Sequence, residues 1–422
     1  MVFGSSGSRG TGLVHRAARE SYSSKLDAHE LLLKTFGPGA GSGLVSAPGR
    51  VNLIGEHIDY HNLPVLPMAV RRSIRVAFRG RGDAHIRAVS GDGYGTRQFE
   101  WTRDLMPAAP GDWENYVRAA ARAVGQKWGV LRGVDAAIVS DLPPAAGLSS
   151  SSALIVAFTL CLLLADGRTP VFEDLMEILP EGEHFVGTRG GGMDHAASLA
   201  SRAGCASLIE FDPLAVRPIP IPADWPFLVA HSLTMAEKSG AARQHYNARR
   251  MAGMSAVARL GFASYREAIR GRSLAEMEEL AARRLPDAIE RDAFLHVASE
   301  ALRVYAAAAA LERRDAAAFG SLLTASHASL RDRLRVSCPA LDRLVDCAMH
   351  AGALGARLTG AGFGGCAVIL CSADEVDAVR NRLIQRYYAN SPLFDEHMHL
   401  IRAEPGPGAL ESLKELNASP HD

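Results

Sequence analysis

Residues 143–152 read PPAAGLSSSS and run directly into an apolar segment, a composition that suits an anion-binding loop. The first turn of a helix presents unpaired backbone N–H groups and a partial positive charge, which together favour phosphate. Gly147 allows a ligand to approach the backbone closely, and four serines supply hydroxyls for phosphate or a metal ion. The alternative is a Gly/Ser linker that ends in a serine N-cap, although linkers do not usually enter a buried helix.

Two large classes of nucleotide enzyme are excluded because their motifs are missing. The pattern G-x-x-x-x-G-K-[ST] is absent and the chain has no Gly-Lys pair, which excludes a P-loop enzyme. The H-R-D and D-F-G motifs of protein kinases are absent as well. A phosphate bound at residues 143–152 therefore meets amides, hydroxyls, arginines and a metal ion, but no lysine from the loop.

A second group of chemistry-bearing side chains consists of Glu56, His57, Asp59 and His61. His57 and His61 have the i, i+4 spacing of a zinc-binding helix. However, no H-E-x-x-H motif is present, and the segment follows an expected strand. We therefore do not favour a zinc site here.

The elements that must position these residues mix strands and helices without regular βαβ alternation. Helical spacing is present at residues 20–36, 113–130 and 338–350, and several helices are expected between residues 240 and 330. The expected strands are residues 44–54 (broken by Ala47-Pro48-Gly49), 65–78, 133–140, 226–231 and 366–370. This pattern favours an α+β fold.

Composition and charge define the broad class of protein. A hydrophobic share of 48% with 22% charged residues is ordinary for a soluble globular protein, and 46 basic against 46 acidic residues argue against nucleic-acid binding. The longest apolar stretch, residues 153–165, is shorter than the roughly 20 residues that a membrane span needs. The six cysteines form no C-x-x-C pair, and the first 12 residues lack the apolar core of a secretion signal. We expect a cytoplasmic protein with reduced cysteines and no membrane partner.

Four segments, in the same order along the chain, resemble the motifs of the GHMP kinases. They are APGRVNLIGEHIDY (47–60), PPAAGLSSSS (143–152), GGGMDH (190–195) and RLTGAGFGG (357–365). The first is similar to the galactokinase signature, so the chain resembles the galactokinase family. Ile58, the run VLPMAV, the four-serine loop and the triple glycine look like the N-acetylgalactosamine kinase branch of that family.

The resemblance implies a two-lobed GHMP kinase fold with the active site in the cleft between the lobes. Residues 20–212 would form the N-terminal lobe with the sugar signature and the ATP phosphate loop. Residues 213–412 would form a ferredoxin-like C-terminal lobe with the glycine-rich third motif. Residues 1–19 and 413–422 are expected to be flexible ends.

The resemblance also implies two catalytic residues. Asp194 matches the catalytic aspartate and should lie beside the anomeric hydroxyl of a sugar, where it orients or accepts the proton. The ordinary pKa of an aspartate is about 3.9, so Asp194 would be a weak base that acts as the proton leaves late. Arg50 matches the paired arginine, which would keep Asp194 ionised and neutralise charge on the phosphoryl group.

Substrate contacts follow from the same match. Glu56, His57 and Asp59 are expected to bind sugar hydroxyls, with Gly191 and Tyr246 as further sugar contacts. Tyr246 lies in the segment HYNAR, and its alternative interpretation is an ordinary position on an amphipathic helix. The ATP phosphates would be bound by Gly147, Leu148, Ser149, Ser150, Ser151 and Ser152. Mg²⁺ would be bound by Ser151 and Glu183, although Pro180 is expected to interrupt the helix before Glu183.

Two departures from the family pattern affect the expected function. His195 stands where the family has Gln, next to Asp194, and a titratable imidazole there would either add a pH dependence around pH 6.5 or alter the sugar contacts. His61-Asn62-Leu63-Pro64 replaces the usual glycine-containing turn, near the substituents that separate galactose from its 2-acetamido analogue. The predicted function is ATP-dependent phosphorylation of the 1-hydroxyl of galactose or N-acetylgalactosamine by a monomer. The alternatives are a non-catalytic sensor of sugar and ATP, or a 1-kinase for another hexose.

Overall fold

The computed structural model describes residues 27–143, 147–187, 191–234 and 241–418. Contacts within the chain group the described residues into two units. Unit 1 contains the described residues up to Ala47, Arg72–Asp141 and Leu154–Gly187; unit 2 contains Pro48–Arg71, Leu142–Ala153 and the described residues from Gly191 onward. The predicted lobe boundary at residue 212 stays a prediction, and the expected leader, residues 1–19, lies outside the described residues.

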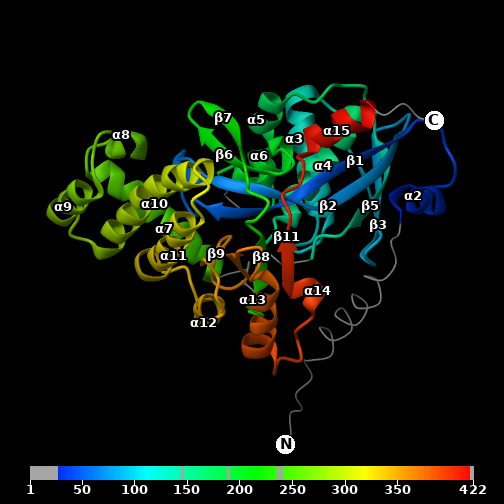
Figure 1. Cartoon of the computed structure of the whole chain (residues 1–422). Helices are drawn as coiled ribbons and strands as arrows, with labels where there is room; N and C mark the ends of the chain where they lie inside the picture. The colour runs from blue at the N-terminus through cyan, green and yellow to red at the C-terminus, as the bar shows by residue number, and fades with distance from the viewer. Residues whose placement is uncertain (1–26, 144–146, 188–190, 235–240, 419–422) are drawn as a thin grey trace, which may run out of the picture. The chain divides into compact units, whose positions relative to one another are not determined.

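The strands of one five-stranded sheet are β1 (Ser42–Ile54), β2 (Leu66–Gly80), β3 (His85–Ser90), β4 (Gly95–Glu100) and β5 (Val134–Ser140). Their order in the sheet is β1-β2-β5-β3-β4; β1, β2, β3 and β5 are labelled in Figure 1. β5 pairs antiparallel with β2 and parallel with β3, and β3 pairs antiparallel with β4. β1 and β2 each contribute residues to both units. The signature of residues 47–60 begins within β1 and continues beyond its end at Ile54.

The helices that lie wholly or partly in unit 1 are α2 (Ala28–Phe36), α3 (Glu114–Trp128), α4 (Ser150–Ala165), which begins in unit 2, and α5 (Phe172–Phe185). The side chain of Asp27 caps α2, and Gly37 ends it at φ 76°, so the described part of the predicted 20–36 helix begins at residue 28. α2 buries Leu31 and Leu32 against the five-stranded sheet. α4 is apolar on all sides after its serines, as expected of a helix at the centre of a core.

Unit 2 contains a four-stranded antiparallel sheet of β8 (Phe227–His231), β9 (Gly355–Thr359), β10 (Cys366–Leu370) and β11 (Leu400–Ala403). The strand order is β11-β8-β10-β9. Helices separate β8 from β9 and β10 from β11, whereas β9 and β10 form a hairpin with Cys366 opposite Thr359. This strand order and connectivity are ferredoxin-like, while the bounds of the C-terminal lobe that the resemblance implies, residues 213–412, stay a prediction. Its core packs the sheet against α12 (Pro339–His350) and α13 (Val376–Leu383).

The other elements of unit 2 are mainly helical. They are α6 (Met193–Ala200), β6 (Cys205–Phe211), β7 (Leu214–Pro220), α7 (Ala241–Arg259), α8 (Tyr265–Ile269), α9 (Leu274–Arg284), α10 (Ala288–Glu312), α11 (Ala316–Ser329), α14 (Glu396–His399) and α15 (Ala409–Ala418). Among the described residues α10 alone is long and apolar enough to cross a membrane, but 72% of its apolar window is buried inside the protein. α10 is thus a core helix, and it packs against α7 and α11.

The predicted break in the first strand is wrong. β1 runs without interruption through Ala47-Pro48-Gly49. Pro48 cannot donate a backbone hydrogen bond, but β1 is an edge strand of its sheet, where a missing donor is tolerated. Gly49 is required for close approach, since a Cβ there would lie 2.6 Å from the backbone oxygen of Leu148.

Two further expectations about local structure are corrected. α5 continues through Pro180 to Phe185, so Glu183 lies on the helix rather than after its end. α15 continues to Ala418, so residues 413–418 are helical rather than loose, because α15 packs against α6 and buries Ala409 and Leu413. Residues 419–422 lie outside the described residues.

Candidate active site

Arg50 and Asp194 form an ion pair although 144 residues separate them in sequence. Arg50 comes from β1, and Asp194 lies in the first turn of α6. The Nε and Nη2 atoms of Arg50 each lie 2.6 Å from Oδ1 of Asp194. The Arg50 residue is 5% exposed, while 22% of the Asp194 side chain remains accessible. The predicted catalytic pair is therefore assembled, with the carboxylate still open to a substrate.

The serine loop lies against the same carboxylate. The Ser149 hydroxyl donates to Oδ2 of Asp194 at 2.5 Å, and the Ser152 hydroxyl lies 3.4 Å from that oxygen. Arg50 donates through Nη1 to the Gly147 carbonyl at 2.9 Å, and its backbone N–H donates to Leu148. The loop predicted to bind phosphate therefore also orients the catalytic pair.

The charge state of Asp194 follows from its neighbours. Burial opposes ionisation, but the Arg50 guanidinium, the Ser149 hydroxyl and the His195 imidazole together hold the pKa of Asp194 below its ordinary value. Asp194 is therefore a carboxylate at neutral pH. It can accept a hydrogen bond from a sugar hydroxyl in the ground state, but it takes a proton only as that proton becomes acidic.

Asp59 is a second buried carboxylate close to Asp194. It lies in a 3₁₀ turn, Asp59–His61, and its Oδ2 accepts the backbone N–H of Gly191 at 3.0 Å. Burial and the nearby charge of Asp194 raise the pKa of Asp59 to about 6. Two predicted sugar contacts, Asp59 and Gly191, are thus brought together close to Asp194, the predicted catalytic residue.

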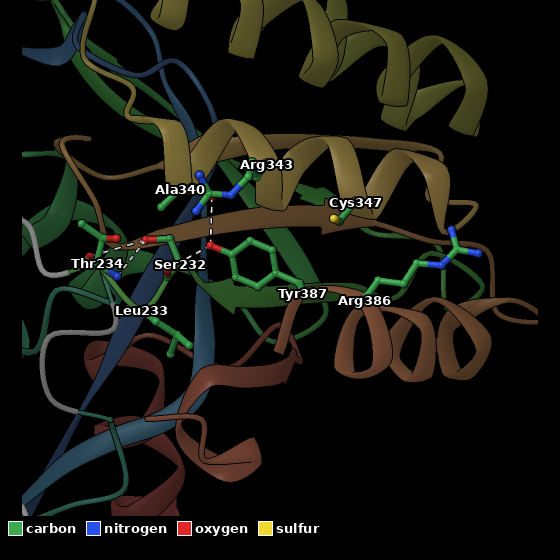
Figure 2. Close-up of a pocket in the computed structure, with 8 residues that line it drawn as sticks. All are labelled: Ser232, Leu233, Thr234, Ala340, Arg343, Cys347, Arg386 and Tyr387. Atoms are coloured by element: carbon green, nitrogen blue, oxygen red, sulfur yellow. Dashed lines mark hydrogen bonds between the residues drawn. The ribbon is translucent and has the colours of Figure 1, made fainter. Parts of the chain in front are cut away.

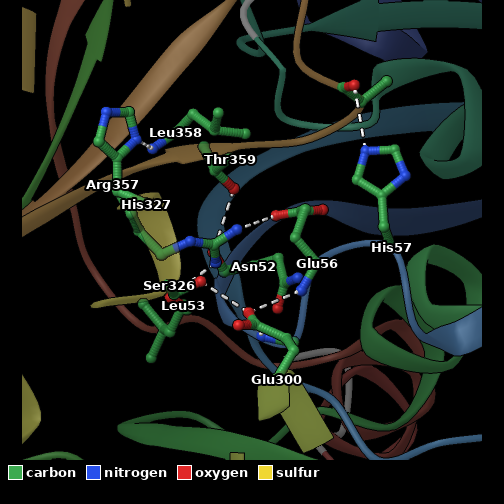
Figure 3. A network of polar contacts seen from close by, with 12 residues as sticks. Asn52, Leu53, Glu56, His57, Glu300, Ser326, His327, Arg357, Leu358 and Thr359 are labelled. Carbon is green, nitrogen blue, oxygen red and sulfur yellow. Dashed lines mark hydrogen bonds and ion pairs between the residues drawn. The ribbon is translucent and has the colours of Figure 1, made fainter. Parts of the chain in front are cut away.

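Glu56 is buried and paired with a residue that the sequence reading did not select. Its Oε2 lies 2.5 Å from Nη2 of Arg357, which is itself completely buried on β9 (Figure 3). Burial raises the pKa of Glu56, and Arg357 and Arg50 oppose that shift. Arg357 donates to Oε2 of Glu56, so a sugar hydroxyl would contact this carboxylate mainly through Oε1.

His57, Tyr60 and Tyr246 form an aromatic group beside these carboxylates. The ring of His57 lies 5.1 Å from that of Tyr246 on α7 and 6.0 Å from that of Tyr60. The Nδ1 atom of His57 is 3.0 Å from the Tyr60 hydroxyl, and its Nε2 atom is 3.2 Å from the Ala361 carbonyl. Burial lowers the pKa of His57 to about 3, so its ring is neutral at pH 7. Tyr246 therefore lies beside two signature residues, and its predicted contact with the sugar stays a proposal.

Comparison with known proteins identifies the family to which this chain belongs. The galactokinase galactose-binding signature matches residues 32–80, the GHMP kinase N-terminal domain matches residues 115–202, and the GHMP kinase C-terminal domain matches residues 307–390. The galactokinase of Roseiflexus sp. is 39% identical over 352 residues, which cover 82% of this chain and 87% of that protein. The chain belongs to the galactokinase family.

Further relatives agree with this assignment. The galactokinase of Streptomyces coelicolor is 35% identical over 371 residues, which cover 87% of this chain and 93% of that protein. The crystal structure of Lactococcus lactis galactokinase complexed with galactose matches with a TM-score of 0.80 at 26% identity, covering 90% of this chain and 97% of the other. A mevalonate kinase from L. major shares the fold alone, at a TM-score of 0.57 and 20% identity. This chain is thus a sugar kinase with the GHMP fold, and its likeness to the N-acetylgalactosamine branch stays a prediction.

The phosphate-loop geometry of this galactokinase-family protein fits an ATP phosphate. Gly147 has φ 69° and Ser149 has φ 53°, and the loop leads into α4 at Ser150. A Cβ on Gly147 would lie 3.7–3.9 Å from atoms of Cys366 and Thr359, so this end of the loop packs against the β9–β10 hairpin, which contains the third motif. The amides of the first turn of α4 have no intrahelical partners and favour an anion.

The residues predicted to bind Mg²⁺ supply suitable oxygen donors. The Ser151 hydroxyl is half-buried at the start of α4 and makes no hydrogen bond to any described residue. Glu183 is 8% exposed near the end of α5, and its charge adds to burial in raising the pKa of Tyr116. A hydroxyl and a carboxylate are ligands that Mg²⁺ accepts while it retains waters and phosphate oxygens. Ser151 belongs to unit 2 and Glu183 to unit 1, so their joint assignment stays a proposal.

Both departures from the family pattern are accommodated. Asn62 stands in the turn at φ 56° and ψ 32°, a left-handed conformation that Asn tolerates better than most residues, so this turn forms with no glycine at that position. His195 is buried on α6, where its imidazole contributes to the low pKa of Asp194. No group of three or more His, Cys, Asp or Glu side chains that could hold a metal ion occurs among the described residues, so nothing in them supports zinc at His57 and His61.

Sequence reasoning missed several buried polar residues around the signature. Arg357 donates to the carbonyls of Asn52 and Leu53, and Glu300 accepts the N–H groups of Gly55 and Glu56 (Figure 3). The signal that could have identified them is chemical: ionisable residues interrupt otherwise apolar segments, and buried charges need partners.

A pocket of about 320 Å³ lies elsewhere in unit 2, beside the end of β8 and the helix α12 (Figure 2). Tyr387 donates to the carbonyls of Ser232 and Ala340 at one side of it. Arg343 and Arg386 also line the pocket. None of the predicted site residues lines this pocket.

Proposed function

We propose that this protein transfers the γ-phosphoryl group of ATP to the 1-hydroxyl of galactose, giving galactose 1-phosphate and ADP. The observation that carries this proposal is the accessible carboxylate of Asp194, which Arg50 pairs with and Asp59 lies close to. The names of the relatives, galactokinases at 31–39% identity, support galactose as the sugar.

The proposed reaction forms a bond between O1 of the sugar and the γ-phosphorus and breaks the bond from that phosphorus to the β,γ-bridging oxygen. Asp194 orients the 1-hydroxyl and accepts its proton late, when the new bond has acidified it. Arg50 holds Asp194 in place and balances the charge that develops on the phosphoryl group. Most of the rate enhancement is expected from positioning the two substrates in line.

Sugar recognition is assigned to Glu56, His57, Asp59, Gly191 and Tyr246. Buried groups that hydrogen-bond a given hydroxyl discriminate strongly against its epimer, because a mismatch leaves them unpaired. The neutral ring of His57 and the ring of Tyr246 provide an apolar and hydrogen-bonding wall.

ATP phosphates are assigned to residues Gly147, Leu148, Ser149, Ser150, Ser151 and Ser152. Ser149 acts mainly through its backbone, because its hydroxyl is bonded to Asp194. Mg²⁺, which neutralises charge on the β- and γ-phosphates, is assigned to Ser151 and Glu183. Replacing Ser151 with Ala should raise the Mg²⁺ concentration needed for half-maximal activity, and an unchanged titration would contradict the assignment.

The proposal includes the setting in which the enzyme works. We propose a cytoplasmic monomer that binds small molecules and no nucleic acid; the balanced charge of the chain supports the last point. Light scattering of the purified protein tests the monomer. A sensor without activity is not favoured, because the catalytic pair is intact and paired at 2.6 Å.

The deciding experiment measures ADP release with Mg²⁺ and ATP against galactose, N-acetylgalactosamine, glucose and N-acetylglucosamine. We expect kcat/KM for galactose to exceed the others at least tenfold, a difference of about 1.4 kcal/mol in transition-state binding. A preference for N-acetylgalactosamine would reassign the substrate to the branch that the sequence resembles. Binding of galactose without ADP release would support the sensor.

A further inference from the structure

Three polar residues of α10, His296, Glu300 and Arg303, lie on one face of a largely apolar helix at spacings of four and three residues. His296 and Glu300 have no exposed surface. Burying a carboxylate is costly unless it is paired and hydrogen-bonded, so the contacts of Glu300 show what the cluster does.

Glu300 binds the backbone of the sugar-signature turn. Its Oε1 atom accepts the N–H groups of Gly55 at 3.0 Å and Glu56 at 3.2 Å. The same oxygen accepts the Ser326 hydroxyl at 2.7 Å, and Oε2 pairs with Arg303 at 2.8 Å. Burial alone would raise the pKa of Glu300. The charges of Arg303, His296 and Arg357 and the Ser326 hydroxyl lower it to about 2, so Glu300 is charged in the folded protein.

His296 contacts the backbone carbonyl of Glu56, the residue whose N–H group Glu300 accepts. Its Nε2 atom lies 3.1 Å from the Glu56 carbonyl and its Nδ1 atom 2.9 Å from the Ser329 hydroxyl. Burial lowers the pKa of His296 to about 4, so its ring carries one proton at pH 7. A carbonyl can only accept, which places that proton on Nε2 and leaves Nδ1 to accept from Ser329.

These contacts hold a turn whose backbone is unfavourable by itself. Gly55 has φ 104° and His57 has φ 62°, and a histidine in that region is uncommon. Strained conformations persist only where surrounding contacts fix them. The N–H and C=O groups of Glu56 are both bound by α10, and its side chain is bound by Arg357, so the turn is held at three points.

We propose that Glu300 and His296 are positioning residues for sugar binding, which fix residues 55–59 so that Glu56, His57 and Asp59 present their polar groups to the sugar. This inference rests on the proposed function. Neither residue is placed in contact with substrate; both act through the turn. The alternative is that Glu300 merely stabilises the core, as a buried ion pair on any helix does.

The test compares two substitutions of one residue. Glu300→Leu keeps approximate volume but leaves two N–H groups unpaired, whereas Glu300→Gln keeps an oxygen that can accept both. We expect Glu300→Leu to raise the KM for galactose at least tenfold with the KM for ATP within twofold of wild type. Glu300→Gln should return the KM for galactose to within threefold of wild type.

Glu114→Leu is the matched control, since Glu114 is a buried carboxylate on α3 that pairs with Arg118 at 2.7 Å and lies in unit 1. Glu114→Leu should leave the KM for galactose and the KM for ATP within twofold of the wild-type values. If Glu300→Leu does not fold, the His296→Phe variant is tested instead. We expect it to raise the KM for galactose at least fivefold. Unchanged galactose KM in the folded variant, or equal increases for galactose and ATP, would overturn the inference. Absence of galactose phosphorylation by the wild-type enzyme would instead overturn the proposed function.

Discussion

At the scale of single residues, the chemistry depends on two carboxylates in contrasting environments. Asp194 faces an arginine and a serine hydroxyl, which lower its pKa, whereas Asp59 is buried near the charge of Asp194, which raises its pKa to about 6. Different pKa values for neighbouring carboxylates are a common basis for separate roles in one site. Here Asp194 is charged across the working range, and Asp59 titrates just below neutral pH.

The role of Asp194 can be tested by an isosteric change. Asp194→Asn keeps the shape but removes the negative charge that accepts the proton, so we expect kcat to fall by about 10²–10⁴ while ATP still binds. Steady-state kinetics and calorimetry measure the two quantities. Asp377→Asn on the exposed face of α13 is the control. Activity of Asp194→Asn within tenfold of wild type would remove Asp194 from catalysis.

Asp59 should give sugar binding a pH dependence. With a folded pKa of about 6, Asp59 is a carboxylate above pH 6 and becomes protonated below it, so the KM for galactose should rise as pH falls through 6. The folded pKa lies above the unfolded value, so this group makes the folded state less stable as pH rises from about 4 to 6. Kinetics between pH 5 and 8 test the first effect and urea unfolding the second. An identical inflection in Asp59→Asn would assign the titration to another group.

At the scale of elements, the site depends on backbone segments that approach each other closely. Gly191 precedes α6, and a Cβ added there would lie 2.3 Å from backbone atoms of Asp59 and Tyr60. No flexible side chain can move aside to relieve such a clash. The glycine is therefore needed so that its N–H can reach the Asp59 carboxylate.

Gly191→Ala should separate these two segments. We expect the KM for galactose to rise more than tenfold, with a smaller change for ATP, as measured by steady-state kinetics. Gly82→Ala is the matched control, because a Cβ there would meet no atom within 4 Å. A Gly191→Ala variant with wild-type KM would show that the contact with Asp59 is not needed.

Elements were predicted well where one local pattern decides them. The helix after the serines and the strand at residues 366–370 follow from apolar runs, and both are present. β1 was predicted to break because Pro and Gly usually interrupt strands, but its place at the sheet edge removes that penalty. Edge position is a property of the assembled sheet, which the local sequence does not reveal.

At the scale of the whole molecule, unit 2 contains three segments that are far apart in sequence. They are the signature turn at residues 55–60, the first turn of α6, and helix α7. A ligand that binds these segments should therefore stabilise that unit as a whole. Binding of any ligand to the folded state alone adds RT ln(1 + [L]/Kd) to its stability.

Galactose at 100 times its Kd should stabilise the protein by about 2.7 kcal/mol and raise Tm by several degrees. Hydrogen exchange should slow most at residues 55–60, 191–195 and 246–250. Glucose, the epimer, is the control and should produce a much smaller shift at equal concentration. Protection confined to Arg72–Asp141 would contradict the assignment of the sugar site to unit 2.

The amino-acid sequence by itself was sufficient for the family and the α+β class, and it selected the candidate site residues, because short motifs encode local backbone geometry and functional groups. Tertiary structure decided which groups meet: Arg50 with Asp194, the Ser149 hydroxyl with that same carboxylate, and Glu300 with a turn 245 residues away. The reason is physical. Local sequence limits φ, ψ and the pattern of burial, whereas a buried charge obtains its partners from whichever distant segments the fold brings beside it.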